Sequence, residues 1–104
     1  MAEFVKQGEV DLYGTILYTG GTSTTLTKII ALRFYNSVAY VLTLERYDAV
    51  TATSEVMYRL TLDAGDTVTD NLSYALNSGD QIIVYSDVPG TTYYVYGIDY
   101  ASSW

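Results

Sequence analysis

The fold is decided by Thr24–Asp48, TTLTKIIALRFYNSVAYVLTLERYD, the longest run of apolar and β-favouring residues in the chain. β-Branched and aromatic residues dominate the run and no period of about 3.6 residues appears, so strands are favoured over a helix. Asn36-Ser37 interrupts it with two residues that are typical of turns. The run therefore predicts two long strands joined by a tight turn, as the central hairpin of a sandwich.

Alternation within the run predicts which side chains enter the core. Apolar side chains share one face of each strand: Leu26, Ile30, Leu32 and Phe34 in the first, and Tyr40, Leu42 and Leu44 in the second. Lys28 interrupts this face near the start of the first strand, where its ammonium group could reach solvent. The opposite face is semi-polar, as in one layer of a sandwich.

Outside this run, short strand patterns recur about every ten residues and are separated by Gly, Asp, Asn and Pro turns. We expect an all-β fold, an antiparallel β-sandwich of about seven or eight strands, jelly-roll-like or immunoglobulin-like. Residues 1–12 carry no strong period and predict an N-terminal arm or edge strand. Residues 13–104 then form a single sandwich domain. Two turns, Leu62–Asp66 and Leu76–Asp80, share the pattern Leu-x-x-Gly-Asp, which we interpret as one turn chemistry used twice.

The composition excludes several kinds of chemistry. The 104 residues include no cysteine and no histidine, which removes disulfides, thiolate sites and the usual general base near neutral pH. The formal charge is −7 and the five basic residues are spread singly, so we expect no nucleic-acid partner. No apolar window is long enough to span a membrane, and the first residues lack a signal-peptide pattern, so we expect no membrane partner.

The acidic residues suggest turns rather than a reactive site. Asp63, Asp66 and Asp70 cluster around one loop, but the spacing of a calcium-binding loop is absent. Aspartate is common in turns because it bonds to its own backbone. No serine lies in a nucleophile elbow. We therefore predict that the chain is not an enzyme and has no catalytic residue, cofactor or metal.

The closing strand is the most suggestive feature, because the chain contains 12 tyrosines and several lie there. Tyr94, Tyr96, Ile98 and Tyr100 alternate onto one face. They could pack across strands, form a subunit interface or stack on a sugar. As interface candidates we select one residue pair near the N-terminus and four aromatic residues near the C-terminus: Phe4, Val5, Tyr94, Tyr96, Tyr100 and Trp104.

Six strand and turn segments follow one another in a characteristic order. They read TILYT, TKIIALRFYNS, AYVLTLERYD, YRLTLDAGDTVTD, LNSGDQIIVYSD and YYVYGIDY. The series, over about residues 15–100, resembles the small β-sandwich virion proteins of tailed bacteriophages. The chain departs from that pattern at Gly20-Gly21, where a proline often precedes the turn, and in its tyrosine content.

The resemblance implies a structural protein without catalytic residues. Its first implication is a capsid decoration (cement) protein that binds and stabilises the assembled capsid. The expected partners are the major capsid protein and the chain itself, in a homo-oligomer such as a trimer, within a virion assembled in the host cytoplasm. The alternatives are a tail, neck or fibre accessory protein, and a module that binds carbohydrate or the host surface.

Overall fold

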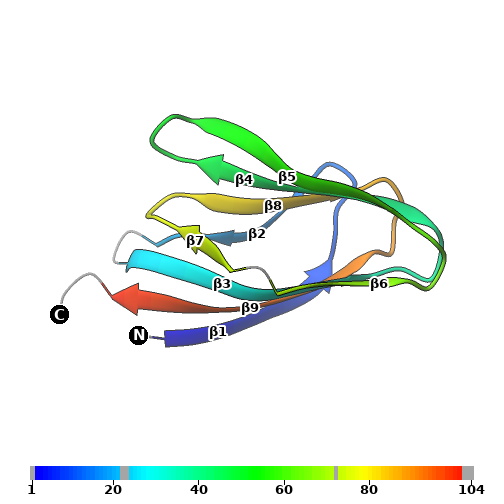
Figure 1. Ribbon diagram of the computed structural model, residues 1–104, viewed down its shortest axis with the longest axis horizontal. Coiled ribbons are helices and arrows are strands. Elements are labelled where there is room, and N and C mark those ends of the chain that lie inside the picture. The colour runs from blue at the N-terminus through cyan, green and yellow to red at the C-terminus, as the bar shows by residue number, and fades with distance from the viewer. Residues whose placement is uncertain (1, 22–23, 72, 102–104) are drawn as a thin grey trace.

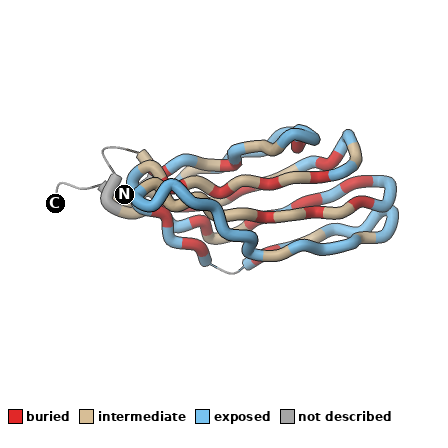
Figure 2. Tube along the Cα trace, turned by 90° about the horizontal axis from the view of Figure 1, so that it is seen from above, coloured by how far each residue is buried: buried red, intermediate tan, exposed pale blue. Residues whose placement is uncertain are grey.

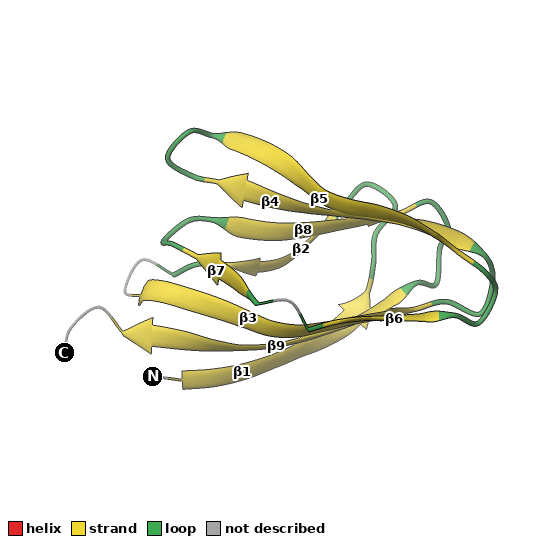
Figure 3. Cartoon of the chain, in the orientation of Figure 1, coloured by secondary structure: helices red, strands yellow, loops and turns green. Residues whose placement is uncertain are grey.

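Nine strands and no helix make up the described part of the chain, which in this computed structural model comprises residues 2–21, 24–71 and 73–101 (Figure 3). In order they are β1 (Ala2–Glu9), β2 (Thr15–Thr19), β3 (Thr24–Tyr35), β4 (Tyr40–Asp48), β5 (Thr53–Leu62), β6 (Thr67–Asp70), β7 (Tyr74–Leu76), β8 (Gln81–Ser86) and β9 (Thr92–Ala101). The count exceeds the expected seven or eight because the weak pattern after Asp66 contains β6.

The strands form two antiparallel sheets that face each other (Figure 1). One sheet has the order β1-β9-β3-β6, with β7 also paired to β3, and the other has the order β2-β8-β4-β5. β6 and β7 occupy successive parts of the same side of β3, so together they take one place in the sheet. With that place counted once, the order is that of a jelly roll, and the predicted all-β sandwich is confirmed.

The predicted central hairpin is wrong, because β3 and β4 belong to different sheets. Residues 36–39 cross from one sheet to the other, and both strands turn their apolar faces toward the same core from opposite sides. Asn36 holds the crossing in place: it is 3% exposed and its side-chain amide donates to Pro89 O at 3.2 Å and Thr91 Oγ1 at 2.8 Å. A hairpin and a crossing both need two amphipathic strands and a short turn, so local sequence does not distinguish them.

The predicted core face of β3 is wrong in its first half. The register of β3 against β9 shifts after Ile29, which places a β-bulge in the strand. The bulge exchanges the two faces, so Ile29 is fully buried while Leu26 and Ile30 are only half-buried. Beyond the bulge, Leu32 and Phe34 are buried as predicted.

The core lies between the two sheets, where buried positions alternate with more exposed ones along the strands (Figure 2). Its fully buried side chains come from both layers: Leu17, Ile29, Phe34, Leu42, Leu44, Leu76, Ile82, Val84 and Val95. On the side where β1 and β2 are the sheet edges, Phe4 stacks on Tyr18 with ring centroids 4.0 Å apart. This stack covers the gap between the sheets there.

The repeated turn chemistry predicted for Leu-x-x-Gly-Asp is present. Gly65 and Gly79 have φ angles of 80° and 84°, a conformation that favours glycine. In each turn the last aspartate N–H bonds back to the carbonyl three residues earlier, Asp66 to Asp63 at 3.1 Å and Asp80 to Asn77 at 3.0 Å. The two turns are therefore the same local structure at two places in the chain.

Substituting Gly97→Ala should destabilise the fold by about 1–3 kcal/mol, the usual cost of overpacking. A Cβ at this position would lie 2.5 Å from the Phe4 ring and 2.6 Å from the Lys28 carbonyl oxygen, and the backbone atom cannot move aside easily. Urea unfolding would measure the change. Gly8→Ala is the matched control, because the atoms nearest to its Cβ would belong to the Tyr93 side chain, at 3.2 Å, and not to the backbone. Equal losses in both variants would contradict this account.

Candidate interaction surface

The outward surface of β1, β9 and β3 gathers the tyrosines of the closing strand. Val95 and Gly97 are buried, so the alternate residues of β9 turn away from the core. We call this surface the tyrosine face and define it by its main members: Glu3, Val5 and Gln7 of β1, Tyr94, Tyr96, Ile98 and Tyr100 of β9, and Lys28, Arg33 and Tyr35 of β3. The predicted sharing of one face by Tyr94, Tyr96, Ile98 and Tyr100 is thus found.

The interface candidates from the sequence divide into three groups. The structure brings together Val5, which is 56% exposed, and the selected tyrosines of β9 on the tyrosine face. Phe4 lies on the opposite side of β1, stacked on Tyr18 between the sheets. Trp104 lies outside the described residues. The charged members of the face were not predicted as interface residues; the one signal for them in the sequence is Lys28 within an apolar alternation.

Strand pairing arranges the tyrosine face in rows. One row runs Glu3–Ile98–Lys28 across β1, β9 and β3. A second row runs Gln7–Tyr94–Arg33. β9 therefore forms an aromatic and apolar centre, with an acidic residue on its β1 side and basic residues on its β3 side.

Two charged side chains of the face, Lys28 and Glu3, interact with tyrosines beside them. The Lys28 ammonium lies 5.9 Å from the centre of the Tyr100 ring, within range of a cation–π interaction. Desolvation, together with the neighbouring Glu3 carboxylate and its hydrogen bond, raises the pKa of Tyr96. Tyr96 therefore stays protonated at neutral pH, and its hydroxyl donates to Glu3.

The edges of both sheets are blunted against pairing with other strands. β2 and β5 lie at the two edges of one sheet, and each has a register shift against its neighbour. β1 turns Lys6 inward, with its ammonium 5.9 Å from the Tyr18 ring centre, and β6 and β7 are short. Bulges, inward charges and short strands all oppose edge-to-edge pairing. The broad faces are therefore better suited to association than the edges.

Two aspartates that could suggest chemistry instead bond tyrosines across the sandwich. Asp70 is 6% exposed and accepts hydrogen bonds from Tyr58 at 2.8 Å and Tyr74 at 2.6 Å. On the opposite side, the Tyr18 hydroxyl donates to Asp99. Burial, reinforced by these bonds, raises the pKa of all three tyrosines. The carboxylates thus hold protonated phenols in place.

A shallow groove opens beside Asp70, between the edge strands β5 and β6. It has a volume of about 390 Å³ and is lined by Tyr58, Leu60, Val68, Thr69, Asp70 and Asn71. Its one buried carboxylate already accepts from two hydroxyl groups, so the groove offers mainly apolar surface. In the described residues, no three His, Cys, Asp or Glu side chains are placed to hold a metal ion.

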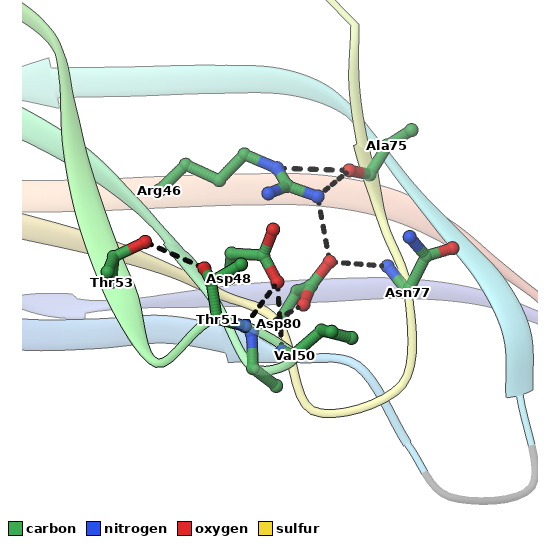
Figure 4. A network of polar contacts seen from close by, with 9 residues as sticks. Arg46, Asp48, Val50, Thr51, Thr53, Ala75, Asn77 and Asp80 are labelled. Carbon is green, nitrogen blue, oxygen red and sulfur yellow. Dashed lines mark hydrogen bonds and ion pairs between the residues drawn. The ribbon is translucent and has the colours of Figure 1, made fainter.

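A third aspartate, Asp80, anchors a network at one end of the sandwich (Figure 4). It is 1% exposed and forms an ion pair with Arg46 at 2.7 Å, while Arg46 also donates to Ala75 O at 3.0 Å. The backbone N–H groups of Asn77 and Ala49 donate to the same carboxylate at 3.0 and 2.9 Å. Burial alone would raise the pKa of Asp80, but these donors outweigh it and hold the pKa below its ordinary value.

Comparison with known proteins supports the fold. No family model matches the sequence, and the search of curated proteins gives no match. A solved chain of Bacillus endospore appendages, described as a novel family of disulfide-linked pili, has a TM-score of 0.55 and 14% identity. The alignment covers 98% of this chain and 87% of that one. The similarity shows a small β-rich fold, and it carries no likeness to a phage protein. Throughout residues 2–21, 24–71 and 73–101, no helix could cross a membrane.

Replacing Asp80 by Asn should lower the free energy of unfolding by about 1–3 kcal/mol near neutral pH, because Arg46 loses its buried partner. The lowered pKa of Asp80 sets the pH dependence. Its contribution is fully present above the ordinary value of 3.8 and is lost as the pH falls through the lower pKa of the folded state.

Urea unfolding of the wild type and the variant, at about pH 7 and about pH 3, would measure this difference. Asp66→Asn is the matched control, since Asp66 occupies the same position in the sister turn and is exposed. A difference between wild type and Asp80→Asn that stays constant down to about pH 3 would contradict the assignment.

Proposed function

We propose that this chain is a structural protein of a phage virion, a capsid decoration protein that binds and stabilises the assembled capsid. The observation that carries the proposal is the tyrosine face, an aromatic surface on three paired strands. Tyrosine is enriched at protein interfaces because it buries a large ring at little conformational cost while its hydroxyl stays bonded. The order of segments that resembles tailed-phage virion proteins supports the same function.

The mechanism of such a protein is mass action. A protein that binds the assembled capsid and not its dissociated subunits stabilises the assembly by its own binding free energy. It needs no reactive group, only a folded platform and a complementary surface. In this proposal the partners are the major capsid protein and further copies of the chain, and the location is the virion, assembled in the host cytoplasm.

A second candidate is an accessory protein of a tail, neck or fibre. The observation in its favour is the fold similarity to the Bacillus endospore appendage chain, which spans nearly the whole of this chain. Both candidates share the coarser role, a small β-rich structural protein. They differ in where the protein sits.

Purified protein added to virion heads stripped of it should bind the heads and not isolated tails. Replacing Tyr94 and Tyr96 by Ala should weaken binding roughly tenfold or more, because buried tyrosines dominate interface energies. Co-sedimentation would measure the bound fraction. Tyr13→Ala is the matched control, since Tyr13 is 93% exposed in a loop away from the face.

Binding to tails alone would favour the second candidate. Binding to neither particle, with a positive signal on a glycan array, would contradict both structural roles and favour a carbohydrate-binding module.

A further inference from the structure

We infer that the tyrosine face is the interface of a two-fold homodimer, in which β9 of one copy packs along β9 of a second copy. The inference rests on the proposed function only in taking this face as an assembly surface, and it names the partner that the face fits. That partner is the chain itself, and because the dimer buries the face, a copy binds a capsid through the same face only after the dimer has dissociated.

The charges on the face are self-complementary under one particular rotation. The row Glu3–Ile98–Lys28 places an acid on one side of β9 and a base on the other. A two-fold axis parallel to β9, lying between the two faces, places the β1 side of one copy over the β3 side of the other. Positions along the strands do not change under this rotation, so each row lies over the same row of the second copy. Glu3 then lies in the same row as the partner's Lys28, and Lys28 in the same row as the partner's Glu3. The charged groups meet when Glu3 turns away from Tyr96 and Lys28 turns away from Tyr100. In an isologous interface each such pair occurs twice.

The second row fits the same rotation. Arg33 lies opposite the partner's Gln7, whose amide oxygen can accept from the guanidinium, and Glu9 is the next outward residue of that strand. Between the two charged margins, Tyr94, Tyr96 and Ile98 meet the same residues of the second copy. The dimer therefore joins apolar centre to apolar centre and acid to base.

The other face-to-face rotation fails on charge. An axis across the strands would lay β3 over β3 with the rows reversed, so that Lys28 approaches the partner's Arg33. Like charges directly opposite are destabilising. The charge pattern thus selects one of the two symmetric arrangements.

Net charge also favours this face over the rest of the surface. The whole chain carries −7 and two copies repel one another. Within the described strands of the tyrosine face, the outward charges balance, with Glu3 and Glu9 against Lys28 and Arg33. The acidic excess lies elsewhere, so this is where a second copy approaches with the least repulsion.

The area of the tyrosine face sets the expected strength of dimerisation. Eight residues of three strands cover about 27 by 14 Å at ordinary strand spacings. Two such faces would bury on the order of 1,000 Å², the low end of specific interfaces. The dimer should therefore form reversibly, with an equilibrium that responds to protein concentration.

Complementary charge reversals test the geometry. Glu3→Lys places a lysine opposite the partner's Lys28 twice, and Lys28→Glu places a glutamate opposite the partner's Glu3 twice. Each variant alone should dimerise roughly tenfold more weakly than the wild type or not at all, as measured by sedimentation equilibrium. An equimolar mixture of the two should dimerise again, because both pairs of the mixed dimer are then attractive.

The controls carry the same charge changes on the other sheet. Glu55→Lys and Arg59→Glu lie on β5, away from the tyrosine face, and should leave dimerisation unchanged. Thermal unfolding confirms that each variant is folded. A wild type that stays monomeric up to submillimolar concentration would overturn the inference, and so would a mixture no more dimeric than either variant.

The result separates this inference from the proposed function. A monomeric wild type that still binds stripped heads would refute the dimer and leave the decoration role standing. A wild type that dimerises as expected but binds neither heads nor tails would refute the virion role and leave the dimer standing.

Discussion

Two apolar sheets can share one core only if the polar groups along the open sides of the sandwich are satisfied, and this requirement shapes the whole molecule. On one side Tyr18 donates to Asp99 of the opposite sheet, and on the other Tyr58 donates to Asp70. Arg46 crosses to β7 and pairs with Asp80. An unpaired buried carboxylate would cost several kcal/mol, so these links fix how the sheets face each other.

The hydrogen bonds and the ion pair along the open sides of the sandwich also determine which acidic residues remain for other roles. Asp70, Asp80 and Asp99 are committed to bonds inside the fold. Other carboxylates, such as Asp63 and Asp66 in one turn, are exposed at the surface. The tyrosine face is instead an arrangement of ordinary side chains over a broad sheet, which is the kind of surface that the proposed structural role needs.

Local sequence was enough for the fold class because alternation is a local property: Leu42 and Leu44 are buried where their pattern predicts. It was insufficient wherever pairing between distant strands decides the outcome. The crossing at Asn36 depends on Thr91 and Pro89, more than fifty residues away. The tyrosine face followed from alternation in β9, whereas its charged margins depend on the registers of β1 and β3 against that strand. No face could be assigned to Phe4 in advance, because residues 1–12 carry no period from which the orientation of its side chain could be predicted.

The bulge in β3 connects the core to the surface. Lys28 and Arg33 are an odd number of positions apart, so a regular strand would point them to opposite faces. The extra residue after Ile29 turns both outward and makes the β3 side of the tyrosine face basic. The same shift turns Thr27 inward, where it is fully buried and its hydroxyl donates to Asp99. The bulge in β3 thus adds a buried hydrogen bond to Asp99 on the Tyr18 side of the sandwich. It also places Lys28 and Arg33 on the tyrosine face, where their charge is opposite to that of Glu3 on the β1 side.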